Sequence, residues 1–276
     1  MSGANARTMV RCLSSKPRRT GILVCQPFFL VIALLLLDQS SIAQTSPGEV
    51  DAYEVSASWL LFAPSGNVQT NSNRVQFASD LGIDGTQSQV GFWFLIQPWH
   101  RSGLFAEFIP YRFDGEQTTA SSFRFGGLTY PSNQSVTSKA TLNYVSAGYL
   151  REIVNRAHIQ GRLLAGVAYF GLRSSASSPS VGSAEVNRDI PFPLVGFLAR
   201  YTRSEDSQWS LRGDIRGMTF GSYGRYIDVS GAFAFNVSQH ISIEAGYRTV
   251  DGVGHTETRG ADLNFRGPTI TFRMHD

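Results

Sequence analysis

The sequence predicts an all-β protein: a closed antiparallel transmembrane β-barrel of ten strands, with eight strands as the alternative. Three observations predict it, namely a period of two in the apolar residues, an N-terminal export signal, and connections that alternate between short and long. The period is clearest over 208–249, where Phe233 and Phe235, then Ile241 and Ile243, are each separated by one small residue. A period of two is that of a β-strand. A soluble sandwich and a barrel in lipid share this pattern, so the other two observations decide between them.

The first 43 residues have the layout of a secretory signal peptide. A leader with four arginines and one lysine precedes an apolar core over 27–37. Small residues at Ser41 and Ala43 then supply a signal peptidase site, so we expect cleavage near Ala43. A retained anchor is the alternative, but the apolar core is short for a spanning helix, which needs about 20 residues. We therefore expect a signal peptide over 1–43 and one barrel domain over 44–276.

Composition excludes several classes of function. Both cysteines, Cys12 and Cys25, lie in the leader, so the exported chain would have no disulfide and no thiolate metal site. Removing residues 1–43 takes five of the 24 Lys and Arg and one of the 21 Asp and Glu, which leaves 19 basic against 20 acidic residues. This near-neutral balance excludes a nucleic-acid partner. The sequence has no phosphate-binding loop, calcium loop or zinc-ligand cluster, so we expect no cofactor and no metal.

Ten strands are predicted in order, and most have about ten residues, the length that a tilted strand needs to cross a bilayer. Their ranges are 53–62, 87–97, 103–113, 140–151, 158–171, 193–203, 208–217, 226–237, 241–249 and 265–273. The connections alternate between turns of three to six residues and polar loops of eight or more. Such asymmetry is typical of membrane barrels, whose short turns face the periplasm and whose long loops face outward. An even number of strands places both termini at the short-turn side.

In these features the chain resembles the small single-chain β-barrel proteins of the bacterial outer membrane, a porin-like superfamily. The resemblance covers residues 51–273 and rests on the leader, on alternating strands such as 229–237 and 241–249, and on the asymmetry of the connections. It implies an outer-membrane location and contact with outer-membrane lipid and lipopolysaccharide. It also implies insertion by the barrel-assembly machinery, and we expect a monomer.

Strand parity assigns a set of charged side chains to the barrel interior. Ionic groups away from water need partners, so we expect arginine–carboxylate networks across the lumen. The expected members are Glu54, Glu107, Arg162, Arg200, Arg212, Asp214, Arg216, Asp228, Glu244 and Arg248. Such a network would either hold the shape of a closed structural barrel or set the selectivity of a narrow, porin-like channel.

Aromatic residues near the predicted strand ends suggest girdles at the two membrane interfaces. They are Trp99 and Trp209 beside short turns, and Tyr111, Tyr169 and Tyr247 near long loops. In the second long loop, the stretch 123–130 predicts either strand extensions above the membrane or a hairpin that stiffens the rim. Long loops of this kind keep a surface binding or adhesion module open as the alternative function.

Enzymes among outer-membrane barrels, such as omptin-type proteases and lipid-modifying hydrolases, need a histidine near an acid or a serine. Four of the five histidines fall at short turns or near the C-terminus. Only His255 lies in a long loop, four residues after Asp251, and no second acidic pair on facing strands accompanies it. We therefore expect no enzyme and assign no catalytic residue, with a barrel-embedded hydrolase as the least favoured alternative.

Overall fold

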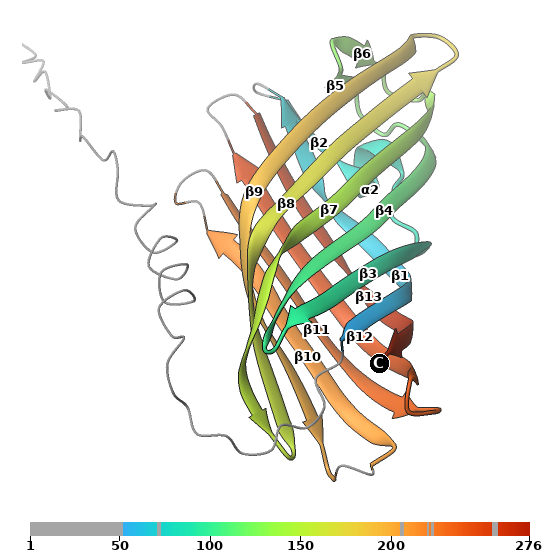
Figure 1. Ribbon diagram of the computed structural model, residues 1–276. Coiled ribbons are helices and arrows are strands. Elements are labelled where there is room, and N and C mark those ends of the chain that lie inside the picture. The colour runs from blue at the N-terminus through green and yellow to red at the C-terminus, as the bar shows by residue number, and fades with distance from the viewer. Residues whose placement is uncertain (1–51, 71–72, 205–206, 220, 222–223, 256–258) are drawn as a thin grey trace, which may run out of the picture. The chain divides into compact units, whose positions relative to one another are not determined.

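A computed structural model of the chain describes residues 52–70, 73–204, 207–219, 221, 224–255 and 259–276. The signal peptide expected over 1–43 lies outside the described residues and stays a prediction. The described part is one large antiparallel sheet that closes on itself, with small additional elements at one end (Figure 1). Among these residues, no helix has both the length and the apolar character needed to cross a membrane.

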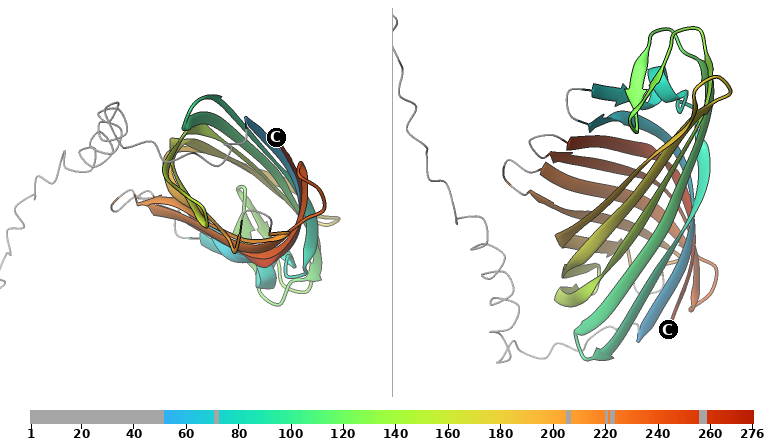
Figure 2. Two further views of the ribbon diagram at one scale, coloured as in Figure 1. Left: turned by 60° about the horizontal axis from the view of Figure 1, so that its bottom comes forward. Right: turned by 90° about the horizontal axis from the view of Figure 1, so that it is seen from above.

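Ten long strands form the barrel wall. They are β1 (Tyr53–Thr70), β3 (Gln87–Trp99), β4 (Ser102–Thr118), β7 (Ser135–Arg156), β8 (Ile159–Ser178), β9 (Gly182–Thr202), β10 (Trp209–Thr219), β11 (Gly224–Asn236), β12 (Ile241–His255) and β13 (Arg259–His275). β1 pairs with β13 from Glu54 opposite His275 up to Thr70 opposite Arg259, and this seam closes the ring that Figure 2 shows in its left view. The prediction of ten antiparallel strands is confirmed over the eight-strand alternative.

The strands run further than predicted at the end that carries the long connections, called the long-loop end below. β8 and β9 continue to Ser178 and Gly182, and only residues 179–181 connect them, whereas the sequence predicts a loop over 172–192. Serine and alanine dominate the extension of β8 over 172–178 and give little contrast in hydropathy, so the period of two fades there although backbone pairing continues.

The outer face of the wall is apolar. On β3, Trp93 and Leu95 are buried, whereas Phe92, Phe94 and Ile96 are 40% to 53% exposed. The same alternation recurs on the other wall strands, so apolar side chains surround the barrel. Soluble proteins rarely expose so large an apolar surface. A barrel in a bilayer presents it to acyl chains, and the inside-out arrangement that the sequence predicts is therefore present.

A folded rim stands at the long-loop end (Figure 1). One part consists of β2 (Asn73–Gln76), which pairs with β1, and the short helix α2 (Phe77–Leu81). The other part is a hairpin of β5 (Phe123–Phe125) and β6 (Leu128–Tyr130). Its turn residues Gly126 and Gly127 have φ of 55° and 92°, a left-handed backbone that favours glycine. For 123–130, the structure therefore has the hairpin and not the strand extensions.

Buried apolar side chains pack the rim, and they belong to the same apolar cluster as those of the lumen. Tyr130 is completely buried and stacks on Phe123 with 5.1 Å between ring centroids. Its phenol donates a hydrogen bond to the backbone oxygen of Ala176 on β8 at 2.7 Å. Burial raises the pKa of this phenol, which keeps the donor protonated. Phe77 and Leu81 of α2 are buried in the same core, so the rim is a packed structure attached to the wall.

Candidate functional site

The barrel interior holds two clusters of ion-paired side chains. The lower cluster lies near the short turns and contains Glu54, Arg162, Arg212, Glu244 and Arg273. The upper cluster lies further toward the long-loop end and contains Glu107, Asp214, Arg216, Asp228 and Arg248. Nine of the ten charged residues that the sequence assigns to the lumen thus take part in ion pairs, and Arg200 is the exception within the described residues.

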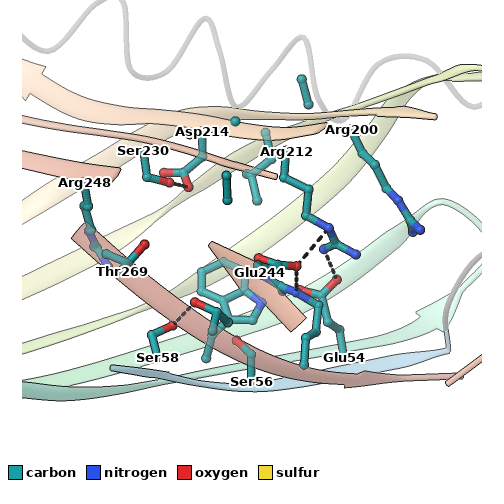
Figure 3. A pocket seen from close by; sticks show the side chains of 18 of the residues that line it. Glu54, Ser56, Ser58, Arg200, Arg212, Asp214, Ser230, Glu244, Arg248 and Thr269 are labelled. Atoms are coloured by element: carbon teal, nitrogen blue, oxygen red, sulfur yellow. Dashed lines mark hydrogen bonds and ion pairs between the residues drawn. The ribbon is translucent and has the colours of Figure 1, made fainter. Parts of the chain in front are cut away.

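Arg273 and Arg212 share two carboxylates in the lower cluster. Arg273 contacts Glu54 and donates from Nε and Nη2 to the two oxygens of Glu244 at 2.7 and 3.1 Å. Arg212 lies 3.1 Å from Glu244 and 3.5 Å from Glu54 (Figure 3). Arg162 reaches Glu54 at 3.8 Å. Because β1 and β8 are four strands apart in the ring of ten, the Glu54–Arg162 pair crosses the lumen.

Two arginines bridge the carboxylates of the upper cluster. Arg248 donates to Glu107 at 2.8 Å and to both oxygens of Asp228 at 2.9 and 2.6 Å. Arg216 contacts Glu107 and lies 3.0 Å from Asp214 and 3.6 Å from Asp228. Glu107 belongs to β4, on the wall opposite β10 and β12, which carry the arginines. The upper cluster therefore also ties opposite walls together.

Polar and aromatic neighbours fix the upper cluster in place. Tyr226 donates its hydroxyl to Asp228 at 3.0 Å, and Ser230 donates to Asp214 at 2.5 Å. The guanidinium of Arg216 lies over the ring of Trp93, 5.6 Å from its centroid. Asp228 has no exposed surface, so the hydroxyl of Tyr226 and the two arginines take the place of its contacts with water.

Aromatic rings fill the lumen between the upper cluster and the long-loop end, and we call them the aromatic plug. Its members are Phe62, Tyr111, Phe113, Tyr144, Phe170, Phe192, Tyr226 and Phe265, each at most 6% exposed. Tyr144 on β7 and Tyr226 on β11 meet from opposite walls with 6.0 Å between ring centroids. Phe170 and Phe192 lie 5.3 and 4.9 Å from Tyr226. The plug therefore packs rings from opposite walls against one another above the charged clusters.

Tyr111 belongs to this plug, and its prediction as an interfacial aromatic is wrong. It is 1% exposed and stacks on Phe265 with 5.1 Å between ring centroids. Its parity on β4 is that of Glu107, so both side chains must face the lumen. The four other predicted aromatics are 39% to 54% exposed on the outer face, namely Trp99, Tyr169, Trp209 and Tyr247. Their position at a membrane boundary stays a prediction.

Sequence reasoning missed two inward charged residues. Arg273 bridges the lower cluster, and the outward alternation of Ile270, Phe272 and Met274 places it on the inner face. Glu152 is 3% exposed and pairs in register with Arg162, although the sequence predicts a turn from this residue on. β7 continues through it with a register shift, which no local pattern signals.

A cavity of about 130 Å³ adjoins both clusters (Figure 3). Besides the charged groups, small and polar residues line it, including Ser56, Ser58, Ser230, Thr269 and Thr271. Arg200 on β9 also lines the cavity, and its Nε is buried without a hydrogen-bond partner among the described residues.

The structure describes no catalytic pair between Asp251 and His255, the two residues that the sequence offers for a hydrolase. Asp251 lies 3.0 Å from Nε of Arg225 on the neighbouring strand. His255 ends β12, and its side chain falls outside what the structure describes. The described residues also contain no group of three or more His, Cys, Asp or Glu that could hold a metal ion.

The fold resembles that of solved outer-membrane proteins, whereas no protein-family model and no curated protein matches the sequence. The outer membrane protease OmpT from Escherichia coli is 12% identical, with a TM-score of 0.50 over 86% of this chain and 100% of that chain. Ail, the attachment invasion locus protein of Yersinia pestis, is 11% identical over 80% of this chain and 99% of its own, with a TM-score of 0.35. The toluene transporter TodX of P. putida is 9% identical over 83% of this chain and 91% of its own, with a TM-score of 0.30.

These comparisons define a class of fold. The chain is a closed β-barrel with the fold of small bacterial outer-membrane β-barrel proteins. At 12% identity, the likeness to OmpT concerns the fold alone and carries no activity with it.

Proposed function

We propose that the protein is an integral outer-membrane barrel that is closed to solutes and anchors a rigid rim at the cell surface. The aromatic plug is the observation that carries this proposal. Tyr144 and Tyr226 meet from opposite walls there, and each is at most 3% exposed. A ten-stranded barrel has a narrow interior that side chains can fill, so we expect the buried rings of the plug to leave no continuous polar path for ions.

The apolar outer face and the barrel fold support an outer-membrane location. In this arrangement the short turns face the periplasm and the rim faces the medium. Export through a signal peptide over 1–43 belongs to the same proposal. Outer-membrane lipid contacts the wall, the barrel-assembly machinery inserts the chain, and the mature protein is a monomer without a cofactor.

A structural role for the charged clusters is favoured over a selectivity filter. Their ion pairs join opposite walls, as between Glu107 and Arg216, and the plug lies directly above them. A hydrolase has less support, because the carboxylate of Asp251 is already paired with Arg225.

Planar-bilayer recording tests the closed barrel. Folded protein, identified by heat-modifiable migration on a gel, is expected to give no discrete conductance steps, because the plug interrupts the water path. A general porin inserted in the same membranes serves as the positive control for detection. Reproducible single-channel steps from the folded protein would contradict the proposal.

Trypsin digestion tests the rigidity of the rim. Arg124 is exposed in the middle of β5, but the neighbouring Phe123 and Phe125 are buried, so the native chain should resist cleavage there. Tyr130→Ala removes the ring stack and the bond to Ala176, and it should speed cleavage after Arg124 by about tenfold or more, which corresponds to roughly 1.4 kcal/mol of local opening.

The matched control is Tyr169→Ala, since Tyr169 is 39% exposed on the outer face and its hydroxyl donates to Asp189 on β9, which is not part of the rim. It should leave the cleavage rate unchanged. Rapid cleavage of the native chain after Arg124 would mean that the rim is a loose loop.

A further inference from the structure

The cavity beside the two clusters has an excess of positive charge that the closed barrel does not explain. Six arginines line it, namely Arg162, Arg200, Arg212, Arg216, Arg248 and Arg273. Four carboxylates line it as well, from Glu54, Glu107, Asp214 and Glu244. The lining therefore carries a formal charge of +2 (six minus four), and Asp228, which pairs with Arg216 and Arg248 but is not itself in the lining, reduces the local charge to +1.

The excess charge is concentrated on two neighbouring strands. Arg200 on β9 stands directly opposite Arg212 on β10 in the antiparallel register. Like charges in directly opposed positions destabilise a sheet. Figure 3 shows both side chains extending into the interior, with Arg212 reaching Glu54 and Glu244. These two carboxylates offset the charge of Arg212, but no carboxylate among the described residues pairs with Arg200, whose charge is therefore left uncompensated.

The two arginines also have buried N–H groups that donate no hydrogen bond among the described residues. Nε of Arg200 and Nη2 of Arg212 are buried and have no hydrogen-bond partner among the described residues. An unpaired buried donor is costly, and a charged one is more so. Water can occupy the cavity, which is large enough for several molecules. Water, however, leaves the repulsion between the guanidinium groups in place, whereas an anion removes it.

We propose that this cavity is a binding site for a small oxyanion such as phosphate, held between Arg200 and Arg212. Guanidinium groups present paired N–H donors in a plane that matches phosphate or carboxylate oxygens. The hydroxyls of Ser56 and Ser58 on β1 line the opposite side and can donate to the remaining oxygens. The aromatic plug blocks the long-loop side, so the ion enters from the short-turn side.

Calorimetric titration of inorganic phosphate into the detergent-solubilised full chain tests the site. The ionic strength is held constant with sodium chloride, so that general screening does not contribute. The wild type should give saturable binding at one site. Arg200→Gln should weaken it about tenfold or more, the effect of losing one charge-assisted hydrogen bond. Arg200→Lys, which keeps the charge, should weaken it less.

Arg203→Gln is the matched control, because Arg203 is exposed beyond the end of β9, three residues from Arg200 and outside the cavity. It should bind phosphate as the wild type does. Absence of saturable binding in the wild type would overturn the proposal, and so would equal weakening by Arg203→Gln. The wild-type titration decides the matter even if Arg200→Gln does not fold.

Fluorescence gives a second, independent readout. Trp93 lines the cavity, whereas Trp59, Trp99 and Trp209 are 49% to 54% exposed on the outer face. With these three replaced by phenylalanine, phosphate should change the emission of Trp93 saturably. Chloride at the same ionic strength should not. An identical response to both salts would show that the cavity does not select oxyanions. Neither measurement depends on whether the barrel conducts.

Discussion

Arg248→Ala should destabilise the barrel by about 3–5 kcal/mol, the usual result of removing one partner from a buried ion pair. Arg248 donates to Glu107 at 2.8 Å and to both oxygens of Asp228. Without it, Asp228, which has no exposed surface, keeps only Arg216 at 3.6 Å and the hydroxyl of Tyr226. Urea unfolding of the refolded protein, followed by heat-modifiable migration, measures the loss.

The control for this variant is an ion pair of similar length on the surface. Arg225 lies 3.0 Å from Asp251, but its side chain is 54% exposed. Arg225→Ala should therefore cost about 1 kcal/mol or less. Arg248→Lys retains the charge but not the paired donors, so its stability should fall between those of the wild type and Arg248→Ala. Equal losses of stability in Arg225→Ala and Arg248→Ala would mean that the ion pairs of the upper cluster stabilise the barrel no more than a solvent-exposed pair does.

Inward charges could be read from the sequence because a period of two is a local property of each strand. Their partners could not, because the pairs join distant parts of the chain. Glu107 and Arg248 are 141 residues apart in sequence and become neighbours only when the barrel closes. The register of every intervening strand decides which carboxylate meets which arginine.

The aromatic plug escaped prediction for a different reason. Tyrosine and phenylalanine suit both a membrane interface and a packed lumen, so their type does not indicate their face. The position of a residue along the alternation of its strand does indicate its face, and Tyr111 alternates in step with Glu107 on β4. In the rim, the sequence predicts the hairpin only as one of two alternatives and does not predict α2, since α2 has five residues and the strands of the hairpin have three each, too few to show a period.

A substitution at the seam between β1 and β13, which closes the barrel, should also cause a large loss of stability. At this seam β13 approaches β1 closely beside Gly267. A β-carbon on Gly267 would lie 1.8 Å from the backbone oxygen of Leu61 and 3.2 Å from the ring of Phe62. The first contact is with backbone and no side-chain rotation relieves it, so Gly267→Ala must move one strand relative to the other. We expect a loss of about 2–4 kcal/mol of stability.

The matched control is Gly231→Ala on β11, where an added β-carbon meets nothing within 4 Å. It should change stability by about 0.5 kcal/mol or less, as for other unhindered surface positions. Hydrogen exchange locates the effect, since Gly267→Ala should speed exchange at the β1–β13 amides and leave the β10–β11 amides protected. Such selectivity follows from the topology, because every other wall strand keeps both of its neighbours when this one seam opens. Uniform loss of protection around the ring would instead mean that the barrel unfolds as one unit and that the seam is no weaker than the rest.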